Sequence, residues 1–336
     1  MAHAIGIDVR YPADGRQIVL RTEHDWNVDV EPVDVAQDGT TFRFTVPPRG
    51  GSLRFKPVLV DDAGPHWANG SNRLALASEG HAVVYPTFFA ERSHATDVVH
   101  LTATHGDHAH DYRVFLPPGY HENLLQHYPV VYMQDGQNLF FAEDAAFGAH
   151  WRVGETLALL TSMNALGPVI IVGVYPHDRH HEYTAPGYQH YGVFLTEELK
   201  PRIDDQYRTM SGPEHTSVIG SSLGGVAAFY LGWHYPHVFG QCAAMSSTFG
   251  YRDDLFERVA SDPVPSTRFY LDSGWPGDNY ESVRDMRARL LSRGLVSGRD
   301  LLYFAFPLAR HTEGDWAERL HLPFQFLLDP VRRASG

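Results

Sequence analysis

The chain has 336 residues, of which 43% are hydrophobic, and a net charge of −13 with histidine neutral. Its length suits two domains of ordinary size, whereas its acidic balance argues against nucleic acid, whose phosphates are bound by Lys and Arg, and against an anionic membrane surface. No apolar run reaches the roughly 20 residues that span a bilayer, and residues 1–10 lack a basic stretch followed by an apolar one, so we expect a cytoplasmic protein.

Short segments typical of β-strands fill the first hundred residues. They are rich in β-branched and aromatic residues, and several alternate polar and apolar positions. These segments are residues 16–21, 41–46, 52–60 and 81–85. Turn sequences such as Asp38-Gly39 lie between them. The regular spacing predicts a small immunoglobulin-like β-sandwich as the first domain, residues 1–100.

Apolar strands alternate with amphipathic helices in the expected second domain, residues 101–336. The strand candidates are residues 111–116, 129–133, 168–174, 216–219, 241–245, 267–271 and 301–306. The helix candidates are residues 153–163, 191–205, 223–234, 280–293 and 316–328. This alternation predicts an α/β fold with a buried, mostly parallel sheet covered by helices on both faces. We expect the linker between the domains within residues 91–110.

A serine lies between glycines in the sequence GSSLGG at residues 220–225. A strand candidate precedes this segment and a helix candidate follows it, which is the setting of a nucleophile elbow. The turn is so sharp that the residues two before and two after the nucleophile need to lack side chains. Gly220 and Gly224 hold these places around Ser222, whereas centring the turn on Ser221 would put apolar side chains there. We therefore predict that Ser222 is the nucleophile.

The acid and the base follow the serine in this type of hydrolase, in that chain order. Asp272 ends one strand candidate, and Asp278 lies further along, in a glycine-containing loop. We favour Asp278, because this loop can carry it over the sheet edge, while Asp272 could cap the turn through backbone contacts; Glu281 is a third candidate. His311 follows the last strand candidate, and we predict that it takes the proton of Ser222 while the acid orients its ring.

Several segments together resemble the putative esterase family, the group of esterase D and enterochelin esterase. They are YPVVYMQDGQNLF at residues 128–140, RHHEYT at 179–184, ELKPRIDDQYRT at 198–209, GSSLGG at 220–225 and HTEGDW at 311–316. The resemblance implies an α/β-hydrolase fold and hydrolysis of carboxylic esters without a cofactor. It also supports Asp278, because GWPGD at residues 274–278 looks like the acid loop of that family, although it is not an identical match.

Further site residues are expected from the nucleophile turn and from the resemblance. The first oxyanion donor is expected to be the backbone N–H of Leu223, at the start of the helix. In the family, the loop after the first parallel strand supplies the second donor, which would be the N–H of Gly136 or Gln137; a plain turn is the alternative. The candidates for lining the pocket are Asp135, Trp151, Tyr183 and Trp275, each of which could equally be ordinary packing.

The N-terminal region resembles, more loosely, the early-set sandwich domains that precede the catalytic domain in enterochelin-esterase-like proteins. Residues 55–60, 67–73 and 85–86 carry this likeness. Such domains are related to carbohydrate-binding modules, so Trp26 and Trp67 could stack on a sugar ring. We favour instead a role of this domain in shaping the rim of the active site.

The chain holds 21 histidines and one cysteine. Two histidine clusters have spacings seen in zinc sites, but we interpret them as solvated surface and expect no metal. They are His105, His108 and His110, and His177, His180 and His181. Cys242 lies in an apolar stretch and is interpreted as a small buried residue.

The leading hypothesis is therefore a serine carboxylic-ester hydrolase that acts through an acyl-enzyme on a Ser-His-Asp triad. Its partner is a small-molecule ester, such as a small, sugar or siderophore-type ester. Two alternatives stay open: an acyltransferase on the same triad, and a carbohydrate-binding protein with a decayed hydrolase domain. The sequence predicts neither the acyl group nor the alcohol nor the oligomeric state.

Overall fold

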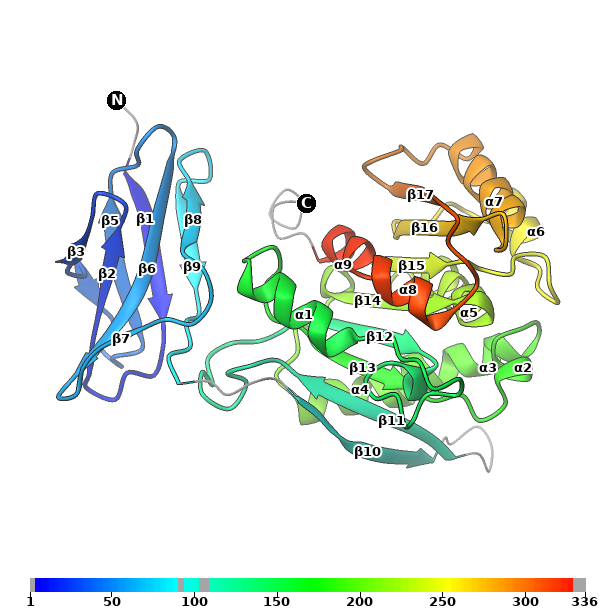
Figure 1. Ribbon diagram of the computed structural model, residues 1–336, viewed down its shortest axis with the longest axis horizontal. Coiled ribbons are helices and arrows are strands. Elements are labelled where there is room, and N and C mark those ends of the chain that lie inside the picture. The colour runs from blue at the N-terminus through cyan, green and yellow to red at the C-terminus, as the bar shows by residue number, and fades with distance from the viewer. Residues whose placement is uncertain (1–3, 90–93, 103–108, 329–336) are drawn as a thin grey trace. The chain divides into compact units, whose positions relative to one another are not determined.

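The structure, a computed structural model, describes residues 4–89, 94–102 and 109–328 (Figure 1). The chain divides into two compact units. The first consists of Met1–Ser93 with two later segments, Pro117–Gln126 and Leu159–Ala165. The second consists of His94–Leu116, His127–Ala158 and Leu166–Gly336.

The first unit is built from two β-sheets around one core. Its strands are β1 (Ile5–Arg10), β2 (Gln17–Thr22), β3 (Asp25–Val30), β4 (Asp34–Val35), β5 (Thr41–Val46), β6 (Ser52–Asp61), β7 (Gly64–Trp67), β8 (Arg73–Leu76) and β9 (His81–Val84). One sheet has the order β4-β5-β1-β9 and the other β3-β2-β6-β7, with β8 also paired to β6. Alternate residues of β1, Ile5, Ile7 and Val9, pack with Leu53 and Phe55 of β6. The predicted N-terminal β-rich domain is thereby confirmed.

The second unit contains an eight-stranded sheet. Its strands are β10 (His94–Thr102), β11 (Ala109–Leu116), β12 (Val130–Gln134), β13 (Ile170–Val174), β14 (Thr216–Ser221), β15 (Gln241–Met245), β16 (Arg268–Trp275) and β17 (Leu301–Pro307). Their order is β10-β11-β13-β12-β14-β15-β16-β17. β10 and β11 are antiparallel to their neighbours, and the strands from β13 to β17 are parallel. The predicted mostly parallel sheet is confirmed, and β10 is an additional strand where the sequence suggested only a linker.

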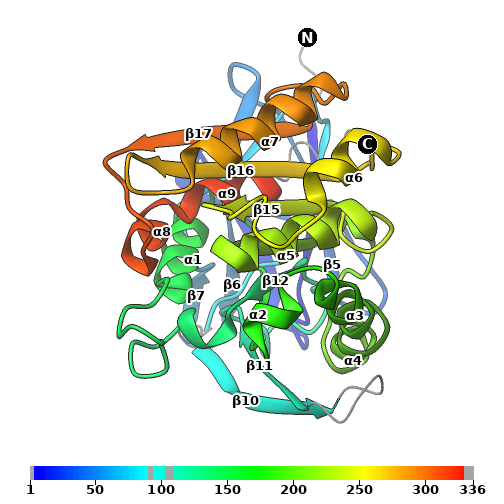
Figure 2. The same cartoon turned by 90° about the vertical axis from the view of Figure 1, so that its right-hand side faces the viewer.

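Helices cover both faces of this sheet. α5 (Ser222–His234), α6 (Leu255–Ser261) and α7 (Tyr280–Ser292) lie over one face, and α1 (Val153–Ser162), α8 (Glu313–Arg319) and α9 (His321–Leu327) over the other (Figure 2). α2 (Arg179–Glu182), α3 (Gly187–Val193) and α4 (Lys200–Gln206) follow β13, and a π-helical turn (Phe194–Leu199) joins α3 to α4. None of the helices in the described part of the chain is both long and apolar enough to cross a membrane.

The register of the parallel strands brings their carboxyl ends to one edge of the sheet. Ser221 of β14 pairs with Met245 of β15, and Met245 pairs in turn with Asp272 of β16. The residues that follow these strands therefore lie close together. Ligand and catalytic sites of open α/β sheets form at this edge, and the predicted site residues follow these strands.

Candidate active site

Ser222 lies where the chain turns sharply out of β14 into α5. Its φ of 56° is left-handed, whereas the preceding Ser221 is extended at −124°. A Cβ added at Gly220 would overlap the backbone carbonyl of Gly224. The two glycines thus let the strand and the helix approach as closely as this turn requires, as expected for a nucleophile elbow.

Ser222, His311 and Asp278 form a continuous chain of hydrogen bonds. Oγ of Ser222 lies 2.9 Å from Nε2 of His311, and Nδ1 of His311 lies 2.7 Å from Oδ1 of Asp278. A carboxylate only accepts hydrogen bonds, so Nδ1 donates to it and Nε2 of the neutral ring is left to accept the serine proton. The side chain of His311 is 33% exposed and that of Asp278 is 0% exposed. The structure thus brings together three side chains from separate loops at the sheet edge.

The Asp278 carboxylate is surrounded by hydrogen-bond donors. Besides His311, Oδ1 accepts from the backbone N–H of Asn279 at 2.7 Å, and Oδ2 accepts from the N–H of Gly274 at 2.6 Å and from the hydroxyl of Ser246. Burial by itself raises the pKa of Asp278, but these hydrogen bonds outweigh it and lower the pKa to about 2. Asp278 is therefore ionised at neutral pH and can stabilise a protonated His311.

The two other acid candidates have different partners. Asp272 is fully buried within β16, where Tyr270 donates to it at 2.9 Å and Nη2 of Arg319 lies 3.1 Å from its Oδ1. Glu281 is exposed on α7 and pairs with Arg284. Of the three candidates, Asp278 is the one bonded to His311.

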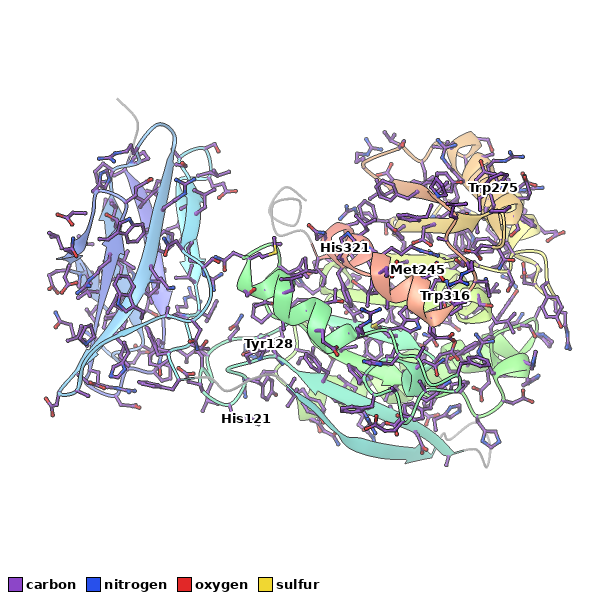
Figure 3. The ribbon with its side chains drawn as sticks, viewed as in Figure 1. His121, Tyr128, Met245, Trp275, Trp316 and His321 are labelled. Atoms are coloured by element: carbon purple, nitrogen blue, oxygen red, sulfur yellow. The ribbon has the colours of Figure 1, made fainter. Side chains whose placement is uncertain are left out.

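Three residues beside Asp278 were not singled out from the sequence. Ser246 follows β15, and its Oγ accepts from Nε1 of Trp316 at 3.0 Å and from Nη2 of Arg319 at 2.6 Å. Trp316 lies on α8 close to Met245, the residue before Ser246 (Figure 3). Trp316 belongs to the HTEGDW segment and so carried a signal, whereas Ser246 and Arg319 carried none.

The loop after β12 lies beside the start of α5. Asp135 has a left-handed φ of 56°, and its side chain accepts from Nε and Nη2 of Arg179 at 2.8 and 2.9 Å. Its backbone N–H donates to the hydroxyl of Tyr183 at 3.0 Å. A Cβ at Gly224 would lie 3.1 Å from Oδ2 of Asp135, and a Cβ at Gly136 would lie 2.5 Å from the Gly173 carbonyl. These contacts hold the predicted oxyanion segments, Gly136-Gln137 and Leu223, on neighbouring elements.

The candidates for lining the pocket differ in exposure. Asp135, Trp151 and Tyr183 are buried, and the ring of Trp151 packs 5.8 Å from that of Trp316. Trp275 is 52% exposed at the end of β16 (Figure 3). Its carbonyl accepts from the N–H of Leu308, which is 79% exposed. Of the four candidates, Trp275 offers the accessible surface.

The prediction that both histidine clusters are solvated surface is wrong for His110. His110 is buried, stacks on Phe194 at 4.1 Å and lies 3.6 Å from Oε1 of Glu182, whereas His177, His180 and His181 are exposed. His105 and His108 lie outside the described residues. Within the residues that the structure describes, no group of three or more His, Cys, Asp or Glu is arranged to hold a metal ion.

The chain matches the model of a known protein family. A family model described as "Putative esterase" matches residues 106–321. Two proteins of Bacillus subtilis (strain 168) are similar in sequence. "Uncharacterized protein YbbA" is 26% identical over 179 residues, 48% of this chain and 67% of the relative. "Uncharacterized protein YjcH" is 31% identical over 166 residues, 48% of this chain and 65% of the relative, so the chain spans about two thirds of these relatives.

Solved structures resemble the fold. A ferulic acid esterase has a TM-score of 0.60 at 18% identity and covers 70% of this chain with 98% of its own. The enterobactin esterase FES from Shigella flexneri has a TM-score of 0.58 at 15% identity and covers 97% of this chain with 93% of its own. The fold is therefore that of an α/β-hydrolase with an N-terminal β-rich domain.

Proposed function

This chain belongs to the putative esterase family and is a carboxylic-ester hydrolase, and we propose that it acts through an acyl-enzyme formed on Ser222. The observation that carries the proposal is the hydrogen-bond chain from Ser222 through His311 to Asp278, at 2.9 and 2.7 Å. A serine hydroxyl is a weak nucleophile until a positioned base can take its proton.

In the acylation step, Oγ of Ser222 attacks the ester carbonyl carbon while Nε2 of His311 takes the hydroxyl proton. The carbonyl oxygen becomes an oxyanion, which the backbone N–H groups of Leu223 and of Gly136 or Gln137 stabilise. His311 then gives its proton to the departing alcohol oxygen as the bond between that oxygen and the carbonyl carbon breaks.

In the deacylation step, a water molecule attacks the acyl carbon of the acyl-enzyme, as Ser222 attacked the ester before. His311 takes a proton from the water as its oxygen adds to the acyl carbon, and returns it to Oγ of Ser222 as the free acid leaves. Asp278 remains ionised throughout and stabilises the imidazolium that forms in each step. This sequence of steps uses protein groups and water.

The substrate is proposed to be a small, sugar or siderophore-type ester. Structural neighbours are named for ferulic acid and for enterobactin, and the exposed Trp275 in the acid loop offers an apolar surface. We further propose that residues 1–100 form an early-set-like domain that precedes the catalytic domain of residues 101–336.

The adjacent serines provide a matched test. Ser222→Ala should lose at least about 10³-fold in kcat on 4-nitrophenyl acetate, whereas Ser221→Ala, the same change one residue earlier, should keep most of the activity. A fluorophosphonate should add its mass to the wild type and to Ser221→Ala but not to Ser222→Ala. Full activity of Ser222→Ala would disprove the proposal.

Two further outcomes address the alternatives. Incubation with ester and a sugar alcohol should yield free acid, and formation of the sugar ester instead would identify an acyltransferase. A wild-type protein that neither reacts with the fluorophosphonate nor hydrolyses any ester of a broad panel would favour a decayed hydrolase.

A further inference from the structure

Two buried carboxylates lie behind His311, and one arginine lies between them. The side chains of Asp272 and Asp278 are 0% exposed, and that of Arg319 is 4% exposed. Nη2 of Arg319 lies 3.1 Å from Oδ1 of Asp272 and 3.6 Å from Oδ2 of Asp278. Charges in such a buried site interact more strongly than charges at the surface, because the effective dielectric constant is lower. The three groups therefore behave as one electrostatic unit.

Ser246 connects this arginine to the carboxylate that contacts His311. Its oxygen accepts hydrogen bonds from Trp316 and Arg319, which are donors only. The single hydroxyl proton of Ser246 is then left for its third partner, Oδ2 of Asp278. This directed chain favours the ionised form of Asp278, because a protonated carboxyl accepts hydrogen bonds less well.

The charge balance explains why an arginine is needed here. Burial raises the pKa of Asp272, and Arg319 is the largest of the causes that oppose this rise. With both carboxylates ionised and His311 neutral, the carboxylates and Arg319 carry one net negative charge, which becomes zero when His311 holds the serine proton. Without Arg319 the same site would hold two like charges and drive a proton onto Asp272, Asp278 or His311. A proton on Asp278 would remove the counter-charge of the imidazolium, and a permanent proton on His311 would remove the base.

We propose that Arg319 is a positioning residue of the triad, which acts through Ser246 to keep Asp278 ionised and directed at His311, while Asp272 anchors the guanidinium. This inference rests on the proposed function. The guanidinium carbon of Arg319 also lies 5.2 Å from the centre of the Phe306 ring, which fixes the side chain from a second direction.

Other charged groups that face His311 and its loop are matched among themselves. Asp315 of α8 lies 3.7 Å from Arg310. Glu313, two residues earlier on the same helix, interacts with Arg179, the partner of Asp135 after β12. Arg319 also lowers the pKa of Asp315, but as the smallest of its causes, so a change at Arg319 acts mainly on Asp272 and Asp278.

The test compares Arg319→Met with Arg258→Met. Arg258 of α6 forms a bidentate ion pair with Asp254, the residue before that helix, so it controls for the loss of an ion pair away from the triad. The rate on 4-nitrophenyl acetate is followed at the isosbestic wavelength of nitrophenol against pH. In Arg319→Met the midpoint of the acid limb of the kcat/KM profile should move to a pH higher by about one to two units. At pH 7, kcat should fall about 10- to 100-fold, while KM stays within about threefold of the wild-type value. Arg258→Met should keep the wild-type profile.

A second variant separates charge balance from packing. Asp272→Asn/Arg319→Met removes one buried charge of each sign, which proteins tolerate better than one unpaired charge. It should fold even if Arg319→Met does not, and its acid limb should return to within about half a pH unit of the wild type. Arg319→Lys, which keeps the charge, should also keep the wild-type limb.

The outcomes are distinct. An unchanged acid limb in Arg319→Met, or a double variant at least as impaired as Arg319→Met, would overturn the inference and leave Arg319 a packing residue. If Ser222→Ala kept its activity in the same assay, the proposed function would fail instead. Loss of activity in Ser222→Ala together with a normal Arg319→Met would overturn only the role of Arg319.

Discussion

Replacing Arg179 by Met should release the loop after β12. The guanidinium donates to both carboxylate oxygens of Asp135, at 2.8 and 2.9 Å, and the side chain of Asp135 is only 5% exposed. The substitution therefore leaves a buried carboxylate without its partner. Breaking a fully buried pair in this way costs about 3–5 kcal/mol. Because the side chain of Arg179 is 34% exposed, water screens part of the interaction, and we expect a loss of about 2 kcal/mol in the free energy of unfolding.

Arg179→Met should lower kcat by more than its loss in the free energy of unfolding would explain. Asp135 immediately precedes Gly136 and Gln137, one of which is proposed to donate its N–H to the oxyanion. An oxyanion donor displaced from its place costs about 10²–10³-fold in kcat. Since this donor acts on the transition state more than on the bound ester, KM should change little.

The double variant Asp135→Asn/Arg179→Met separates the two effects. The neutral amide leaves no unpaired charge, so urea unfolding should show most of the stability restored, while kcat stays low because the bidentate contact is still missing. Both quantities are measured on the same preparations, with 4-nitrophenyl acetate as substrate. A wild-type kcat in Arg179→Met would refute the reasoning, as would recovery of kcat in step with stability.

Two further changes test the local geometry. Gly220→Ala places a Cβ against the backbone of Gly224 and should lower the free energy of unfolding, measured in urea, by about 3 kcal/mol or more. In the control Gly167→Ala the Cβ meets nothing within 4 Å, so stability should change little. Equal effects of the two changes would contradict the steric explanation. Burial raises the pKa of Glu182 from 4.5 to about 7, so between these values the folded protein holds a proton that the unfolded chain has released, and its stability falls as the pH rises. Glu182→Gln should therefore be more stable than the wild type at pH 8 but not at pH 4, and a difference of the same size at both pH values would exclude this cause.

The parts of the site that the sequence predicts are those fixed by neighbours in the chain. The glycines around Ser222, the strand before it and the helix after it all lie within a short segment, and the steric demand of the turn selects one serine of the pair. His311 was likewise chosen by its place after the last strand candidate. The choice between Asp278 and Asp272 depends on where each carboxylate points, which the residues next to them in the chain do not specify. In the structure Asp272 shares a strand face with Tyr270, two residues earlier.

The parts that escaped prediction depend on contacts between distant segments. Arg319 lies on a helix that the sequence marks as amphipathic, where an arginine is expected at the surface. It is buried because Asp272, 47 positions earlier, forms an ion pair with it and Ser246 accepts its hydrogen bond. The helix predicted over residues 316–328 is two helices, α8 and α9, that meet at Leu320. β10 was missed for the same reason, since its pairing with β11 defines it.

Four parallel strands of the eight-stranded sheet are each followed by a residue with a left-handed backbone. This shared geometry helps to place the site residues at the carboxyl edge of the sheet. The first residue after β12, β14, β15 and β17 has a left-handed backbone, with φ of 56° at Asp135, 56° at Ser222, 44° at Ser246 and 66° at Leu308. Such a conformation costs about 1–3 kcal/mol for a residue other than glycine. Glycine would remove that cost, but at the first three positions it would also remove the carboxylate held by Arg179, the proposed nucleophile and the hydroxyl between Arg319 and Asp278. At these three positions the strain is therefore retained because the side chain has a role or a partner there, and the buried strands before each turn offset the cost.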